Sequence, residues 1–214
     1  MHAVASASTS TGRTTATPNR FRWRVVDIVV ASVLGVAVGL LFWFWNGVGY
    51  GWFSVMDAAT PGLGGLAVGI WLIGGVIGGL VIRKPGAALL VEVVAAIVSM
   101  LLGNVWGVST LLSGLVQGLG AELIFAAVLY RRFGLWVAAA AGAAAGAAAW
   151  IFELFYGDSP NILKTFEFNL IYLGSVVASG VVLAGVLGWL LVRALAKTGA
   201  LSRFAAGREQ ADEV

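Results

Sequence analysis

Six long apolar runs alternate with short polar connections along most of this 214-residue chain. A run of about 20 apolar residues is long enough for an α-helix to cross the hydrocarbon core of a membrane. The pattern therefore predicts an all-α integral membrane bundle of six transmembrane helices. The expected helices cover about residues 25–45, 63–82, 85–103, 108–130, 135–155 and 168–195.

Basic residues lie almost entirely on one side of this pattern. They precede the first run and follow the second, fourth and sixth runs, whereas the other three connections carry only Lys164 of the 13 Lys and Arg residues. Basic loops of a membrane protein are retained on the cytoplasmic side. We therefore expect both termini in the cytoplasm of a bacterial cell and the six-helix domain in its plasma membrane.

The chain divides into three parts. Residues 1–21 are polar and low in complexity, which predicts a disordered cytoplasmic tail. Residues 22–196 form the expected membrane domain, and residues 197–214 form a second cytoplasmic tail. Within the membrane domain, the segment at about 46–61 is too rich in Gly to span the membrane and too apolar for a solvated loop. We expect this segment to form a lid on the outer side.

Composition excludes most kinds of soluble protein and most kinds of enzyme. Hydrophobic residues make up 60% of the chain and charged residues 11%, whereas soluble domains carry about 25% charged residues. Cys is absent and His2 is the single His, which excludes disulfides, thiolate or His-based metal sites and His-based triads. We expect no cofactor and no metal site. Basic residues spread along one membrane face favour anionic lipid or a cytoplasmic partner over nucleic acid.

Small residues recur at helical spacing in several runs. Ala31, Gly35 and Gly39 form a ladder on the first expected helix. Small side chains allow helix backbones to approach closely in a membrane. Such a ladder either packs inside the bundle or faces outward as a docking surface for a membrane partner.

Two carboxyl groups, those of Glu92 and Glu122, fall within apolar runs. A carboxylate at the centre of a transmembrane helix costs roughly 2.5–3.5 kcal/mol on insertion scales, so an interaction must offset this cost. The two residues lie at similar depths on consecutive antiparallel helices. They are either a structural pair that joins these helices or a site for a polar or cationic ligand.

Further polar and aromatic residues lie towards the outer half of the expected bundle. Gln117 lies five residues from Glu122 in the outward direction, and other polar groups lie at outer helix ends. The Trp residues nearby fit either an aromatic belt at the lipid headgroups or the walls of a pocket for a flat, partly cationic heterocycle. The candidate substrate-binding residues are Glu92, Gln117, Glu122, Trp43, Trp52, Trp106, Glu153, Asn169 and Tyr172.

The stretch at 83–134 contains the segments RKPGAA, LLGNVWG and QGLGAELIFA. In these segments the chain resembles the YkoE-type S components of energy-coupling-factor vitamin transporters, and the likeness extends over about residues 22–196. The resemblance implies a membrane subunit that binds thiamine or its hydroxymethylpyrimidine precursor from outside. It also implies delivery together with a transmembrane coupling subunit and two cytoplasmic ATPase subunits. The chain itself would not be an enzyme, because the partners would hydrolyse ATP.

The resemblance also suggests where partners bind. S components often carry an AxxxA docking motif on the first helix, and Ala31 with Gly35 is a small-residue variant of it. Basic pairs on the inner side would contribute electrostatically. The candidate docking residues are Ala31, Gly35, Arg83, Lys84, Arg131 and Arg132.

A second function stays open at this point. The chain alone would be a proton-coupled small-molecule transporter or channel if Glu92 and Glu122 relayed protons across the membrane. An intramembrane enzyme is less consistent with the sequence, because it contains no nucleophile and base set.

Overall fold

The structure is a computed structural model that describes residues 21–157, 159–202, 204, 206 and 207. The described residues form helices and turns, without strands, which confirms the predicted all-α class. The predicted tail at 1–21 lies outside the described residues apart from Phe21, and the tail at 197–214 is described only in part. The elements are α1 (Val25–Ala59), η1 (Leu63–Leu72), α2 (Ile73–Ile82), α3 (Ala87–Leu101), α4 (Ser109–Ala127), α5 (Leu135–Phe155), η2 (Asn161–Leu163), α6 (Phe166–Ser179), η3 (Gly180–Val186) and α7 (Leu187–Lys197).

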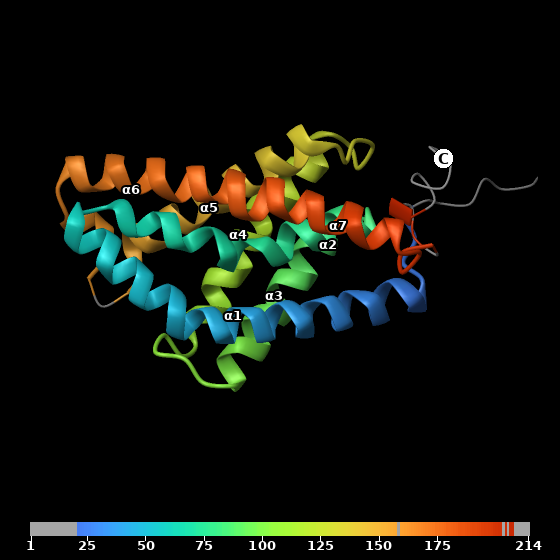
Figure 1. The fold of residues 1–214 in the computed structure, drawn as a ribbon, viewed down its shortest axis with the longest axis horizontal. Coiled ribbons are helices and arrows are strands. Elements are labelled where there is room, and N and C mark those ends of the chain that lie inside the picture. The colour runs from blue at the N-terminus through green and yellow to red at the C-terminus, as the bar shows by residue number, and fades with distance from the viewer. Residues whose placement is uncertain (1–20, 158, 203, 205, 208–214) are drawn as a thin grey trace, which may run out of the picture.

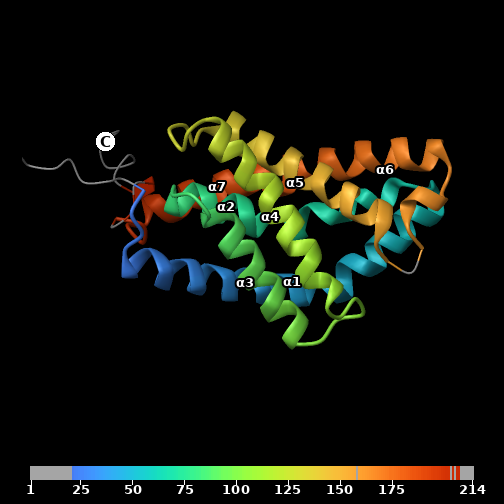
Figure 2. The same cartoon turned by 180° about the vertical axis from the view of Figure 1, so that it is seen from behind.

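The helices surround α2, whose ten residues are all buried. In Figure 1, α1 runs along one side of the bundle and α6 with α7 along the other. Figure 2 shows α3 and α4 crossing the opposite face of the molecule. α4 packs against α3 and α5, and α5 also packs against α6 and η3. The start of α1 and the end of α7 lie at the same end of the bundle (Figure 1), as an even number of passes requires.

Five helical stretches are long and apolar enough to cross a membrane: Val25–Ala59, Leu63–Ile82, Ser109–Ala127, Leu135–Phe155 and Phe166–Lys197. The remaining predicted span is α3, which has only 15 residues. At 1.5 Å per residue it is about 22 Å long. The multi-pass architecture is therefore as predicted, with one short pass.

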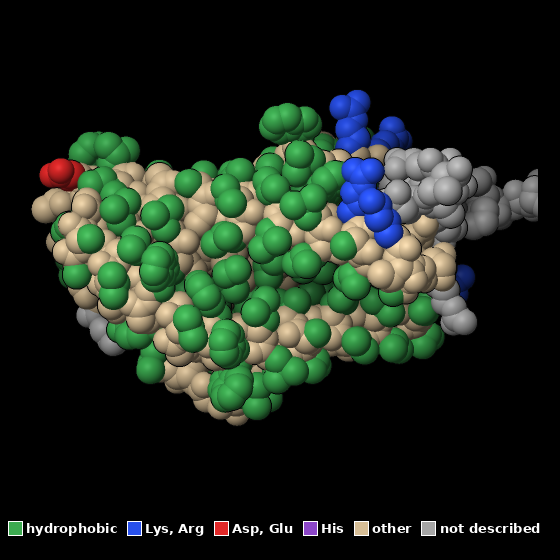
Figure 3. Space-filling model, in the orientation of Figure 1, with side chains coloured by type: hydrophobic (Ala, Val, Ile, Leu, Met, Phe, Trp, Pro, Cys, Tyr) green, Lys and Arg blue, Asp and Glu red, His purple; other side chains and the backbone are tan. Residues whose placement is uncertain are grey.

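The described Lys and Arg side chains gather at the end of the bundle that holds the start of α1 and the end of α7, as Figure 3 shows. Lys84 contacts Arg22 and Asp27 there, whereas Lys164 lies in the connection between α5 and α6 at the other end. We call these the basic end and the opposite end. The predicted separation of charge is confirmed, and the cytoplasmic placement of the basic end stays a prediction.

α1 is much longer than predicted. The sequence predicts that the first helix ends near residue 45 and that a separate lid follows, but the helix continues to Ala59 over 35 residues. A helix satisfies its own backbone hydrogen bonds, which a non-helical segment near the lipid cannot do. Figure 1 shows that α1 bends towards η1 along its second half, and this half contains Gly47, Gly49 and Gly51. Movement of this segment as a lid stays a prediction.

Two predicted continuous helices change their winding midway. The expected helix at 63–82 begins as the 3₁₀ helix η1, and the one at 168–195 contains the π-helical stretch η3. The hydroxyl groups of Ser175 and Ser179 in α6 donate to the carbonyl oxygens of Gly62 and Gly65, both over 2.8 Å. A Cβ atom on Gly69 would lie 2.4 Å from the Ser179 carbonyl oxygen. Close packing on α6 thus accompanies the tight winding of η1.

The small-residue ladder of α1 packs inside the bundle. Ala31 is fully buried, and a Cβ atom on Gly35 would lie 2.5 Å from a methyl group of Val94 in α3. The internal-packing interpretation is therefore confirmed for this ladder. Burial of Ala31 and the close approach of Gly35 to α3 disfavour a docking surface at these two residues, and their docking role stays a prediction.

Candidate binding cavity

A cavity of about 270 Å³ lies in the half of the bundle towards the opposite end. Its walls come from α1, η1, α3, α4, α5 and α6 and from the connections at 102–108 and 156–165. The rim residues Tyr156, Gly157 and Ser159 are exposed. The volume is near the lower end of the range for small-molecule sites, about 300–1,000 Å³.

Five of the nine predicted substrate-binding residues line this cavity. They come from α3, α4, α5, α6 and the connection between α3 and α4, so residues far apart in the sequence meet there. The other four lie elsewhere, as described below. The lining residues from the predicted set are Glu92, Gln117, Trp106, Glu153 and Tyr172.

Aromatic rings form one wall of the cavity. The rings of Trp71 and Trp106 have centroids 5.5 Å apart and meet edge to face at 81°. The ring of Tyr50 meets Trp106 in the same way, at 5.7 Å and 80°. Edge-to-face packing leaves ring faces available, which a flat ligand ring uses for stacking. The pocket interpretation of the Trp residues thus fits Trp106.

Asn46 fixes the orientation of this wall. Its amide oxygen accepts a hydrogen bond from the Trp71 indole N–H over 2.9 Å. Its amide nitrogen donates to the hydroxyl of Ser99 over 2.9 Å. One side chain of α1 therefore connects η1 to α3 through two hydrogen bonds at the cavity surface.

The carboxyl group of Glu92 lies at the buried end of the cavity. The residue is 1% exposed, and its Oε2 accepts a hydrogen bond from the backbone N–H of Gly75 over 2.6 Å. Its Oε1 has no hydrogen-bond partner in the structure. Buried polar atoms are nearly always paired in native proteins, so an unpaired carboxyl oxygen in a cavity indicates a position for a ligand.

α4 adds neutral polar groups to the cavity. Gln117 is buried, and its amide nitrogen donates to the hydroxyl of Ser113 over 2.7 Å. Both side chains line the cavity together with Glu92. The predicted polar stripe of α4 therefore faces the cavity.

Charged groups also line the cavity near its rim. The carboxyl group of Glu153, at the end of α5, lines the cavity together with the hydroxyl of Tyr172 and the ammonium of Lys164. The Lys164 ammonium lies 4.1 Å from the centroid of the Phe168 ring. The cavity thus has one carboxyl at its buried end and a carboxyl with an ammonium near its rim.

Glu122 lies outside the cavity and binds the beginning of α3. Its Oε1 accepts from the backbone N–H of Gly86 and from the hydroxyl of Tyr130, both over 2.7 Å. Its Oε2 accepts from the backbone N–H groups of Ala88 and Leu89 over 2.9 and 3.3 Å. Burial and the neighbouring Glu122 carboxylate raise the pKa of the Tyr130 hydroxyl. The assignment of Glu122 to the substrate site is disfavoured, because these groups of the protein use both of its oxygens and Glu122 does not line the cavity.

The expected pairing of Glu92 with Glu122 is also absent among the described contacts. Glu92 bonds to Gly75 in α2, whereas Glu122 bonds to the first turn of α3 and to Tyr130. A proton relay between the two acids therefore has no direct hydrogen bond to follow. The stand-alone proton-coupled transporter loses the structural feature on which it was based.

Three further predicted site residues lie away from the cavity lining. Trp43 and Trp52 are about half exposed on the outside of α1, which fits the aromatic-belt interpretation. Asn169 accepts from the Trp150 indole N–H over 3.1 Å and donates to the Asn161 carbonyl over 2.7 Å. Asn161 lines the cavity, so Asn169 positions the rim rather than contacting its interior.

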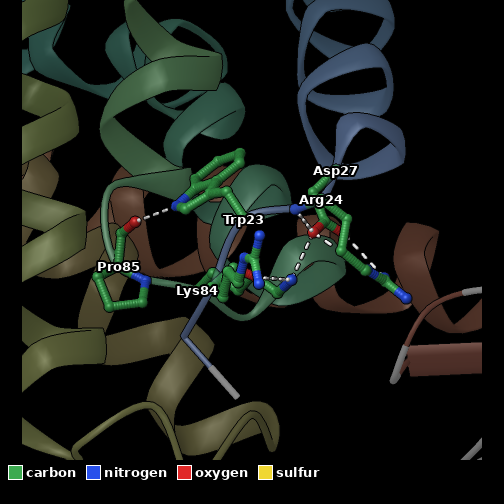
Figure 4. Close-up of polar contacts among 6 residues, drawn as sticks. Trp23, Arg24, Asp27, Lys84 and Pro85 are labelled. Carbon is green, nitrogen blue, oxygen red and sulfur yellow. Dashed lines mark hydrogen bonds and ion pairs between the residues drawn. The ribbon is translucent and has the colours of Figure 1, made fainter. Parts of the chain in front are cut away.

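Half of the basic residues predicted to dock a partner are held by contacts inside the chain. Figure 4 shows the Lys84 ammonium directed at the buried Asp27 carboxylate, which Arg24 also binds over 2.8 Å. The Arg83 guanidinium lies 4.6 Å from the centroid of the Phe133 ring. Arg131 and Arg132 are exposed. A docking role therefore stays a prediction for Arg131 and Arg132, whereas the placement of Arg83 and Lys84 favours internal stabilisation.

Several cavity residues have no distinguishing signal in the sequence. Trp71 and Ser99 lie within apolar runs predicted as transmembrane helices, and Tyr50 and Phe53 lie in the segment expected to be a lid. The helical continuation of α1 places Asn46, Tyr50 and Phe53 at spacings of four and three residues, which share one helix face. A prediction of helix over residues 46–59 would have placed these three side chains on one face and identified them as candidates for the cavity.

Comparison with known proteins provides independent information on this architecture. Residues 26–148 match the family model described as an ABC-type cobalt transport system, permease component. The chain is 40% identical over 194 residues to the putative HMP/thiamine permease protein YkoE of Bacillus subtilis (strain 168). That alignment covers 87% of this chain and 92% of the relative.

A solved structure has the same fold. It is described as the crystal structure of an S-component of ECF transporter, and it superposes with a TM-score of 0.82. The two chains are 35% identical, and the match covers 90% of this chain and 95% of the other. The resemblance seen in the sequence is therefore confirmed over nearly the whole membrane domain.

Proposed function

Because the chain belongs to the S components of energy-coupling-factor transporters, the substrate-binding membrane subunits of these importers, we propose that it captures thiamine or its hydroxymethylpyrimidine precursor. The name of the Bacillus subtilis relative, an HMP/thiamine permease protein, supports this substrate class. The single observation that carries the proposal is the unpaired Glu92 oxygen at the buried end of an aromatic-walled cavity.

The chemistry of the cavity fits an aminopyrimidine. Such a ring has N–H donors on its edge and two flat faces. The Glu92 carboxyl accepts from this edge, Gln117 supplies an amide beside it, and the rings of Trp71 and Trp106 contact its faces. In thiamine a positively charged thiazolium ring is linked to the pyrimidine, and the Glu153 carboxyl near the rim attracts that charge.

A free metal ion fits the described residues less well. The matched family model is named for cobalt transport, but the described residues contain no group of three or more His, Asp and Glu side chains that would hold a metal ion. The carboxyls of the cavity lie in different helices, and Lys164 adds a positive charge to its lining. An organic, hydrogen-bond-donating ligand is the better match.

The proposal includes partner subunits. A transmembrane coupling subunit and two cytoplasmic ATPase subunits would deliver the captured ligand, and the ATPases would supply the enzymatic activity. The basic end would then face the cytoplasm of a bacterial plasma membrane, with the cavity rim outside. Arg131 and Arg132 are exposed at that end, where either the coupling subunit or anionic lipid would find them.

Ligand binding to the purified chain in detergent tests this function. We expect thiamine or hydroxymethylpyrimidine to release or absorb heat in a titration and to quench Trp fluorescence. Trp71→Phe and Trp106→Phe should each reduce the quench, because both indoles line the cavity. Trp136→Phe is the matched control, since Trp136 is 84% exposed and does not line it. Absence of heat and of quenching with both compounds would reject the substrate.

A further inference from the structure

Lys164 stands apart from the other described basic residues. Eight of the nine described Lys and Arg residues belong to the basic end, whereas Lys164 follows η2 and lines the cavity. Its ammonium lies 4.1 Å from the centroid of the Phe168 ring, within the range of a cation–π contact. A positive charge at the rim of a cavity proposed for a cationic ligand requires an explanation, because like charges repel.

The surroundings of this ammonium are those that a ligand cation would occupy. The Phe168 ring is 8% exposed and stacks on Tyr172, with centroids 5.7 Å apart and an angle of 11°. The Glu153 carboxyl lines the same cavity and attracts the Lys164 ammonium without an ion pair within 4.0 Å. An aromatic ring beside a carboxylate is the standard environment for binding an organic cation. Phe168, Tyr172, Glu153 and Lys164 all line the cavity.

The Lys164 ammonium is able to leave this position without a change in the fold. The backbone N–H of Lys164 donates to the Asn161 carbonyl over 3.0 Å, which holds the main chain at the end of η2. The ammonium itself is carried on a flexible four-carbon stem and has no salt bridge within 4.0 Å among the described residues. A bound cation would therefore displace the side chain towards solvent.

We propose that Lys164 is a tethered competitor that occupies the cation subsite formed by Phe168 and Glu153 until a cationic ligand displaces its ammonium. The inference rests on the proposed function and adds a specificity device to it. The lysine weakens binding of every ligand that places a positive charge on the Phe168 ring. A neutral ligand has no charge to offer this ring and the Glu153 carboxyl, so it binds without displacing the ammonium and its affinity does not depend on Lys164. Lys164 thereby sets the preference between charged and neutral members of one ligand class.

The test compares thiamine with its neutral isostere, in which carbon replaces the quaternary nitrogen. Titration calorimetry on the full chain gives both dissociation constants. Lys164→Met keeps an unbranched, flexible side chain that is one atom shorter, and it removes the charge. We expect about tenfold tighter binding of thiamine, because the ligand no longer displaces a cation from the ring, and a change of less than about twofold for the isostere.

Two further variants separate occupancy of the ring from general electrostatics. Lys197→Gln removes a positive charge from an exposed residue at the basic end and should change neither constant. Phe168→Leu removes the ring, and in this background Lys164→Met should lose most of its effect on thiamine. The isostere serves as the check that each variant still folds and binds.

The outcomes decide between the two proposals. If the wild-type chain binds neither thiamine nor the isostere nor hydroxymethylpyrimidine, the proposed function fails. If it binds hydroxymethylpyrimidine alone, the competitor role alone is overturned. If it binds thiamine and Lys164→Met leaves the ratio of the two constants unchanged or weakens thiamine, the competitor role alone is overturned. A gain in thiamine affinity that persists fully in Phe168→Leu would also overturn it, because the effect would then arise from net charge.

Discussion

Glu92 and Glu122 are both buried carboxyls in neighbouring helices, but their surroundings differ. Glu122 lies towards the basic end and accepts four hydrogen bonds, three of them from backbone N–H groups at the start of α3. Glu92 accepts one hydrogen bond, and its other oxygen has no partner. The first acid completes a helix end, and the second leaves an acceptor at a cavity surface.

This difference extends to the regions around the two acids. At the basic end, Asp27 binds Arg24 and Lys84, and the Trp23 indole donates to the Pro85 carbonyl over 3.0 Å (Figure 4). Polar groups there are paired within the chain. In the cavity the Glu92 oxygen is unpaired, which is costly unless a ligand supplies the missing partner. Burial of a carboxyl alone thus does not identify a ligand site, whereas its unused hydrogen-bonding capacity does.

The largest expected effect is on stability, from Glu122→Ala. The change leaves the N–H groups of Gly86, Ala88 and Leu89 without their acceptor at the beginning of α3. Unpaired buried donors cost about 1–3 kcal/mol each, so we expect a loss of about 3–5 kcal/mol in the free energy of unfolding. Chemical unfolding in mixed detergent micelles measures this loss.

The same variant tests the contrast with Glu92. The fraction of Glu122→Ala that remains folded should bind ligand with wild-type affinity, because Glu122 does not line the cavity. Glu122→Gln is the milder companion, since its amide oxygen still accepts from α3. A variant of either kind that keeps its stability but loses ligand affinity would show that Glu122 acts in binding after all.

The next effect is on binding, from Glu92→Gln. The substitution keeps the shape of the side chain and an acceptor for the Gly75 N–H, but it replaces the unpaired Oε1 acceptor with an NH₂ donor. A buried polar group left without its partner costs about 1–3 kcal/mol, so we expect ligand affinity to fall by roughly 5- to 150-fold. Titration calorimetry measures it, alongside an unfolding curve that should stay close to wild type. Unchanged affinity would place the ligand elsewhere in the cavity.

Much of the fold follows from the sequence alone. The periodicity of apolar runs predicts the bundle, and α5 begins at Leu135 and ends at Phe155 as predicted. The end of α1 is harder to predict from the sequence. Gly47, Gly49 and Gly51 lower the helix propensity there, whereas in the structure the surrounding helices support the helix. The winding of η1 and η3 depends on contacts with residues more than 100 positions away, such as Ser175 with Gly62. No local pattern encodes such contacts.

The site is predictable by residue type and only partly by position. Depth along the helices brings Glu92, Gln117 and Glu153 to one cavity, since Glu92 and Gln117 lie near the middle of apolar helices and Glu153 lies near the opposite end. Depth does not specify the direction of a side chain around the helix axis. Glu122 and Trp43 have plausible depths but face other neighbours. The backbone donors that satisfy Glu122 belong to a turn whose position is set only by the tertiary structure.

The smallest effect that sharpens the comparison comes from Asn46→Leu. This change removes the acceptor of the Trp71 indole N–H and the donor to Ser99, so the aromatic wall loses its fixed orientation. A neutral hydrogen bond contributes about 1 kcal/mol, which predicts ligand affinity about three- to tenfold weaker. Trp43→Phe is the matched control, because Trp43 also belongs to α1 but lies outside the cavity. If Asn46→Leu leaves affinity and the Trp emission spectrum unchanged, ring packing alone holds the aromatic wall. The hydrogen bonds of Asn46 then contribute nothing to affinity, and Glu92 stays as the group on which the prediction for binding depends.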